Sequence, residues 1–102
     1  ILDVRFLPNP HWDENLRPLS GLDQLVKDYV LASSLATEFS DKVNNLLELI
    51  LPAYVQEGRS YFTIGIGCTG GRHRSVAVAG DLAERIAGMG YKLRVTHRDV
   101  AL

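Results

Sequence analysis

Apolar residues at helical spacing define the longest regular segment of the chain, between residues 34 and 51. They recur every three or four positions, which places them on one face of a helix. These positions are Leu35, Phe39, Val43, Leu46, Leu47, Ile50 and Leu51. Ser33 or Ser34 is expected to cap the start, because a serine hydroxyl accepts a hydrogen bond from an unpaired amide. Pro52 is expected to kink or break the helix, and Gly58 to end the segment.

Two further helices and three strands are predicted on either side of this segment. The helices cover residues 22–30 and 73–89, where apolar positions again follow a helical spacing. The strands cover residues 2–7, 60–67 and 91–96, which are rich in β-branched and aromatic side chains. The predicted order is therefore β-α-α-β-α-β.

This alternation of strands and helices predicts an α/β fold with a small, mostly parallel sheet covered by helices. In such sheets, ligands bind beyond the carboxyl ends of the strands. The three histidines of the chain, His11, His73 and His97, each follow one predicted strand, and arginines stand beside two of them. The pattern therefore predicts one basic rim that binds an anion.

Length and composition indicate one globular domain over residues 1–102. The chain has 46% hydrophobic and 23% charged residues, which excludes a disordered, collagen-like or disulfide-rich class. No apolar run reaches the roughly 20 residues that a membrane-spanning helix needs. The chain has one cysteine and no secretory signal, so we expect a cytoplasmic location. Because the first residue is not Met, a domain cut from a longer protein is expected.

Charge is divided unevenly along the chain, although the net charge is only −1. Residues 1–57 carry 4 Lys/Arg and 9 Asp/Glu, whereas residues 58–102 carry 7 Lys/Arg and 3 Asp/Glu. The basic second half suits an anionic partner, while acidic solvent-facing helices in the first half are the simpler explanation. A net charge near zero predicts weak affinity for a nucleic-acid backbone.

The segment 67–75, Gly-Cys-Thr-Gly-Gly-Arg-His-Arg-Ser, carries the strongest functional signal. Here a predicted strand turns through glycines into the start of a helix, where unpaired amides and the helix dipole attract an anion. Arg74 is suited to grip a phosphate through two parallel hydrogen bonds, and Thr69 and Ser75 offer hydroxyl groups. The alternative is a glycine-rich turn whose arginines simply face solvent.

Cys68 and Arg74 also match the Cys-x5-Arg spacing of cysteine-dependent phosphatases. In that reading the thiolate of Cys68 attacks phosphorus, Arg74 holds the phosphate and Asp13 is a distant general acid. A small buried residue at a strand end is the simpler explanation of Cys68, and a passive ligand contact is a third one. The sequence leaves these three interpretations open.

Other site classes receive less support from the sequence. No Gly-x4-Gly-Lys-Ser/Thr motif is present, so a nucleotide P-loop is not expected within these residues. The single cysteine and separated histidines lack metal-ligand spacing, and no metal site is expected. Trp12 beside His11 suits either stacking on a sugar or base, or anchoring of its loop.

Four segments together resemble the C-terminal domain of the RapZ family, the RNase adapter or YvcJ-type nucleotide-binding proteins. They are residues 3–12, 16–23, 66–75 and 96–98, and the resemblance extends over essentially the whole chain. It implies a fold similar to a phosphofructokinase subdomain, and no enzymatic activity in this domain. It also implies a separate N-terminal P-loop domain that binds and hydrolyses ATP or GTP, so that no cofactor is expected here.

The same resemblance implies a ligand, partners and a set of binding residues. The expected ligand is a phosphorylated amino sugar, glucosamine-6-phosphate, or a similar small anion. A small regulatory RNA, the protein's own P-loop domain and a homo-oligomer are expected partners, and a membrane is not. The expected ligand contacts are His11, Thr69, Gly70, Gly71, His73, Arg74 and Ser75, with Asn9, Arg17 and Arg98 around them.

Overall fold

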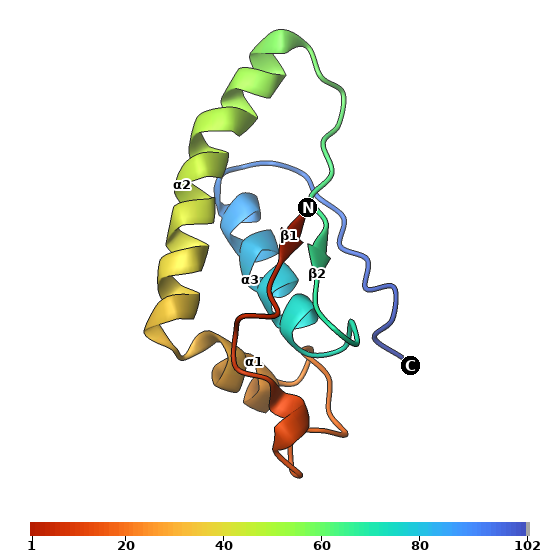
Figure 1. Cartoon of the computed structure of the whole chain (residues 1–102). Coiled ribbons are helices and arrows are strands. Elements are labelled where there is room, and N and C mark those ends of the chain that lie inside the picture. Colours follow the sequence, from red (N-terminus) through yellow and green to blue (C-terminus); the bar gives the residue numbers. More distant parts are fainter. Residues whose placement is uncertain (102) are drawn as a thin grey trace.

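The computed structural model describes residues 1–101 and has three helices beside a small parallel sheet (Figure 1). Its elements are β1 (Leu2–Asp3), the 3-10 helix η1 (Pro10–Trp12), α1 (Gln24–Leu31), α2 (Ser34–Glu57), β2 (Ile66–Gly67) and α3 (Arg74–Gly88). The mixed α/β class is confirmed. The resemblance to a phosphofructokinase subdomain stays a prediction.

The sheet is parallel, as predicted, but much smaller than the sequence pattern suggested. Leu2 lies opposite Ile66, and Asp3 lies opposite Gly67. The strand predicted over residues 2–7 ends at Asp3 because the carboxylate of Asp3 accepts the amide of Arg5 at 3.0 Å. The amide of Leu7 then donates to the carbonyl of Val4 at 3.2 Å, which turns the chain away from the sheet.

The strands predicted over residues 60–67 and 91–96 also need correction. Only Ile66–Gly67 of the first segment forms a strand, and residues 91–96 form none. Within residues 1–101, no backbone hydrogen bond joins the 91–96 segment to β2. Both segments instead line an open cavity of about 910 Å³ beside α2 and α3. Their side chains favour strands, but propensity alone does not bring two backbones within pairing distance.

The helix boundaries follow the capping residues. The carboxylate of Asp23 accepts the amide of Leu25 and starts α1, and the hydroxyl of Ser33 accepts the amide of Ala36 at 3.1 Å and starts α2. Gly58 ends α2 with a left-handed φ of 95°, as expected for a glycine in that position. These findings confirm Ser33, rather than Ser34, as the cap.

The expected break at Pro52 is wrong, because α2 continues through it to Glu57. Proline removes one backbone donor, and the helical turns on both sides are long enough to carry the helix past it. The buried face of α2 is also narrower than predicted. It comprises Ala36, Ser40, Leu47 and Leu51, whereas Leu35 and Leu46 are about half exposed at 51% and 53%.

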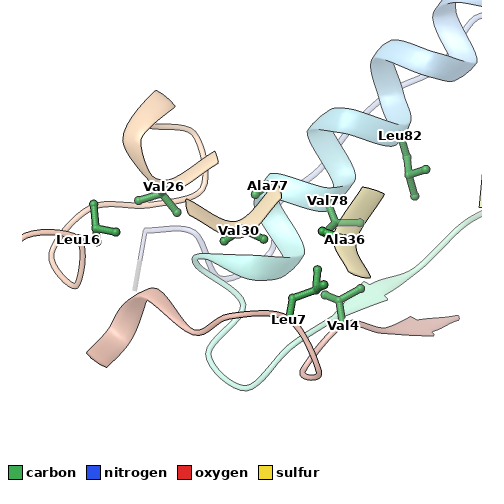
Figure 2. Packing of buried hydrophobic residues seen from close by; sticks show 9 residues of the cluster. All are labelled: Val4, Leu7, Leu16, Val26, Val30, Ala36, Ala77, Val78 and Leu82. Carbon is green, nitrogen blue, oxygen red and sulfur yellow. The ribbon is translucent and has the colours of Figure 1, made fainter. Parts of the chain in front are cut away.

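The hydrophobic core lies where α1 and the first half of α3 meet the segment after β1 (Figure 2). Its members are Val4, Leu7, Leu16, Val26, Val30, Ala36, Ala77, Val78 and Leu82. This packing fixes the N-terminal half of α3 against the loops that follow β1. No helix within residues 1–101 is long and apolar enough to cross a membrane.

Candidate anion-binding site

The loop over residues 68–73 connects β2 to α3 and carries exposed backbone. Gly71 has a φ of 72°, a conformation that favours glycine. A Cβ added at Gly67 or Gly70 would meet nothing within 4 Å, so the backbone there is open to a ligand. Within residues 1–101, none of the amides of residues 70–73 donates to a backbone carbonyl. The Gly71 amide faces the sulfur of Cys68, which leaves the amides of Gly70, Arg72 and His73 without a backbone acceptor beside the start of a helix.

The thiol of Cys68 lies against the first turn of α3. It donates to the hydroxyl of Ser75 at 3.2 Å and accepts the amide of Ser75 at 3.4 Å. Burial acts to raise the pKa of the Cys68 thiol. The hydrogen bonds from Ser75 and the Gly71 amide, together with the charge of Arg74, outweigh it and lower that pKa below 9.0. The thiolate is thus favoured by the groups that surround it.

The side chain of Arg74 makes three hydrogen bonds within the protein. It is only 5% exposed, and its Nη1 donates to the carbonyls of Arg5, at 2.5 Å, and Leu7, at 3.3 Å. Its Nη2 donates to the hydroxyl of Thr69 at 3.3 Å. The guanidinium therefore ties the turn after β1 to the start of α3, and only part of its donor capacity is left for a ligand.

Gly21 sets the position of the α3 start from the opposite side. Its amide donates to the carbonyl of Arg72 at 2.7 Å. A Cβ at this position would lie 2.4 Å from the carbonyl oxygen of His73 and 2.6 Å from the amide nitrogen of Ala77. No side chain fits there. Sequence reasoning missed this contact, because a glycine that follows Ser20 indicates a turn and says nothing about which distant backbone lies against it.

A chain of hydrogen bonds joins the loop after β1 to the α3 start. The side chain of Asn9 accepts the amide of His11 at 3.1 Å and caps η1. Arg17 Nε donates to the carbonyl of His11 at 2.6 Å, and Nε2 of His73 donates to the carbonyl of Arg17 at 3.1 Å. The structure thus connects four of the predicted ligand contacts. Beside them, the ring of Trp12 lies 5.4 Å from that of His11 and is 77% exposed.

The segment over residues 97–100 reaches the same loop. Arg72 Nε donates to the carbonyl of Val100 at 3.1 Å, which anchors this segment beside the loop. Arg98 Nη2 pairs with the carboxylate of Asp99 at 3.0 Å, and the side chain of Arg98 is 91% exposed. His97 lines the same cavity as Thr69 and Gly71. Asp99 was not expected at the site from the sequence, whereas Arg72 belonged to the predicted loop without being named as a ligand contact.

Comparison with known proteins identifies the family of this chain. The family model of the RapZ C-terminal domain matches residues 1–101. The chain belongs to the RapZ C-terminal domain family. It is 56% identical over 100 residues to a nucleotide-binding protein of Parafrankia sp., and 54% identical over 101 residues to nucleotide-binding proteins of Syntrophotalea carbinolica and Mycolicibacterium smegmatis.

These alignments cover 98%, 99% and 98% of this chain but only 35% of each relative. The chain therefore spans about a third of the length of the curated relatives it matches. The RapZ C-terminal domain is one part of proteins that are named for nucleotide binding. The expected P-loop domain and its ATP or GTP stay predictions.

In this RapZ C-terminal domain, the predicted contacts fall into groups around one loop. Thr69, Gly70, Gly71, His73, Arg74 and Ser75 lie in the loop and the first turn of α3. Asn9, His11 and Arg17 reach it through the hydrogen bonds described above, and Arg98 lies beside Asp99, whose side chain contacts the loop at Gly71. Within residues 1–101, no cluster of three metal-ligating side chains is present.

Asp13 occupies a place that bears on the phosphatase interpretation. Its carboxylate accepts the amide of Asn15 at 2.8 Å, and its own amide donates to the carbonyl of Pro10 at 3.0 Å. Both contacts stabilise the turn after η1. Within residues 1–101, no hydrogen bond or ion pair joins the carboxylate of Asp13 to Cys68 or Arg74.

Proposed function

We propose that this domain is a regulatory sensor that binds a small phosphorylated ligand, an amino-sugar phosphate such as glucosamine-6-phosphate, at the 68–73 loop. The observation that carries the proposal is the open glycine backbone before α3, where the amides of Gly70, Arg72 and His73 have no backbone acceptor. Free amides and a helix N-terminus stabilise a phosphate without a metal ion. Arg72, His73 and Arg98 add positive or hydrogen-bonding groups around the same backbone.

The sensor is proposed to act within a longer protein. Its relatives are named nucleotide-binding proteins, and this chain spans about a third of their length. A P-loop domain that binds ATP or GTP would then receive the signal from the ligand-bound loop. Ligand binding would change the nucleotide-binding domain only if the two states of the loop contact it differently.

The proposal is tested by calorimetric titration of the chain with glucosamine-6-phosphate. Arg98→Ala removes a 91% exposed cation beside the loop and should weaken binding about three- to tenfold without affecting the fold. Lys42→Ala on α2 removes the same charge far from the loop in sequence and should leave affinity unchanged. Equal affinities for both variants and the unmodified chain would exclude the 68–73 loop as the binding site.

A cysteine-dependent phosphatase is the second candidate function, and the environment of Cys68 favours it. The lowered thiol pKa and the position at the start of α3 suit a nucleophile. The orientation of Arg74 weighs against this activity, because its guanidinium donates to the carbonyls of Arg5 and Leu7. To hold a phosphate with two hydrogen bonds, Arg74 would have to give up these partners. Phosphate release from a phosphomonoester that Cys68→Ser abolishes would support this activity.

Binding of a small regulatory RNA is a further proposal, one that the basic second half of the chain favours. RNA phosphates would use the same free amides and arginines as a small phosphorylated ligand. Binding that depends on phosphate contacts weakens steeply as salt increases. Competition between RNA and glucosamine-6-phosphate, measured at two salt concentrations, would test whether both use the loop.

A further inference from the structure

A carboxylate faces the loop that is proposed to bind phosphate. A Cβ added at Gly71 would lie 3.0 Å from both Cβ and Oδ2 of Asp99. The side chain of Asp99 is only 26% exposed, and the neighbouring Val100 is held by Arg72. Asp99 therefore packs on the open side of Gly71 and is part of the loop's surroundings.

This placement is electrostatically costly for a ligand that carries only negative charge. Both oxygens of Asp99 contact Arg98, at distances between 3.0 and 3.3 Å. Arg98 is 91% exposed, however, and an exposed ion pair screens its carboxylate only weakly. A bound phosphate near Gly71 would meet the negative charge of Asp99 as well as the cations around it.

A ligand with both a phosphate and an ammonium group resolves this conflict. The amides of the loop and the nearby arginines suit the phosphate, and the carboxylate of Asp99 suits the ammonium. A neutral sugar phosphate would leave Asp99 without a cationic partner from the ligand. Because the site holds a carboxylate as well as cations, it favours a ligand that carries both an ammonium and a phosphate group, and it disfavours a ligand with a phosphate group alone.

We infer that Asp99 is a specificity-determining residue, which selects phosphorylated amino sugars over neutral sugar phosphates by pairing with the ligand's ammonium group. The inference rests on the proposed function and adds the residue that binds the ammonium group of the ligand. Gly71 takes part indirectly, since its missing side chain leaves the space that Asp99 occupies.

The experiment compares glucosamine-6-phosphate with glucose-6-phosphate, which has a hydroxyl in place of the ammonium group. Dissociation constants are measured for the unmodified chain, for Asp99→Asn and for Asp41→Asn, the same change on α2. We expect the unmodified chain and Asp41→Asn to prefer the amino sugar about tenfold. Asp99→Asn should bring the ratio close to one by weakening the amino sugar and strengthening glucose-6-phosphate.

Two results would overturn the inference while leaving the proposed function intact. One is an unchanged preference in Asp99→Asn. The other is an equal rise in the affinity of Asp99→Asn for both ligands, which would mean that Asp99 only repels the phosphate group and does not bind the ammonium group. If neither sugar phosphate binds the unmodified chain or either variant, the proposed function itself fails and the inference falls with it.

Discussion

The two ends of α3 are built in different ways. At the N-terminal end, Arg74, Ser75 and Val76 are buried, and the backbone at Gly21 touches the first turn directly. The open cavity runs along α3 from Ser75 to Ile86, and its lining includes Phe62 and Leu93, which are each 41% exposed. Figure 1 shows the 91–101 segment passing this region without forming a strand.

The difference between the two ends shows where the fold holds side chains in well-defined positions. Around the N-terminal end, buried polar groups are satisfied by partners far away in the sequence, such as Arg74 with the carbonyl of Leu7. A network of this kind fixes geometry because a small displacement leaves a buried group without a partner. At the C-terminal end, the polar link to α2 is the ion pair of Arg85 with Asp41 at 3.0 Å, whose carboxylate is 58% exposed and so held less closely. The proposed ligand site lies at the closely specified end.

The largest expected effect comes from Gly21→Ala. The added Cβ would collide with backbone atoms of His73 and Ala77, which cannot move without displacing α3. We expect the free energy of unfolding to fall by about 3 kcal/mol, measured by urea denaturation. Gly80→Ala is the control, because a Cβ there meets nothing within 4 Å, and it should stabilise α3 by about 0.5–1 kcal/mol. Equal stabilities would mean that the Gly21 contact is not tight.

Arg74→Met should have the next largest effect. Methionine keeps the apolar stem but leaves the carbonyls of Arg5 and Leu7 without this donor. A loss of about 2 kcal/mol in the free energy of unfolding is expected, again by urea denaturation. Arg98→Ala, at an exposed position, should change stability by no more than about 0.5 kcal/mol. If Arg74→Met left the free energy of unfolding unchanged, the guanidinium of Arg74 would be available to bind ligand.

Leu93→Ala tests the other end of α3. Because Leu93 is 41% exposed beside the cavity, its truncation should cost about 1 kcal/mol or less. Leu82→Ala, in the core at 2% exposure, should cost about 2–5 kcal/mol. Similar losses for both leucines, measured by thermal or urea unfolding, would show that the 91–96 segment is packed as tightly as the core.

The smallest expected effect concerns the titration of Cys68. Its pKa is lower in the folded chain than the usual value of 9.0, so the unfolded chain binds more protons as the thiol titrates. Stability should therefore rise with pH through this range, be fully present above the unfolded pKa, and be lost as pH falls through the folded pKa. Cys68→Ala should lack this dependence.

The alkylation rate of Cys68 measures the same pKa directly. The midpoint of the rate against pH should lie below that of a free cysteine and rise in Ser75→Ala, which lacks the hydroxyl partner. A midpoint that does not move in Ser75→Ala would contradict the assigned cause.

Local features of the fold were predictable from the sequence, whereas distant contacts were not. Ser33 and Gly58 determine helix ends through atoms within a few residues, so capping rules identified them. The loop between β2 and α3 was likewise recognised from its glycines. The strand over residues 91–96 was predicted wrongly, because strand formation depends on a second backbone that the side-chain pattern does not specify.

The polar contacts of the site were beyond sequence reasoning for the same reason. Arg74 was predicted as a phosphate ligand from its place after a glycine-rich loop at the start of a helix, and nothing in that pattern indicated Arg5 as a partner. Asp99 and Gly71 are 28 residues apart, so their contact comes from the fold alone. The sequence indicated the residues along the loop, whereas the contacts that Gly21 and Asp99 make from other segments were missed.

The most direct test of the central claim is a phosphorus NMR titration of glucosamine-6-phosphate with the chain. Binding at the 68–73 loop predicts that the ester signal shifts or broadens in proportion to the protein, that Arg98→Ala weakens this change, and that no inorganic phosphate appears. An ester signal that stays unchanged at millimolar concentrations of protein and ligand would contradict the claim that this loop senses a phosphorylated amino sugar.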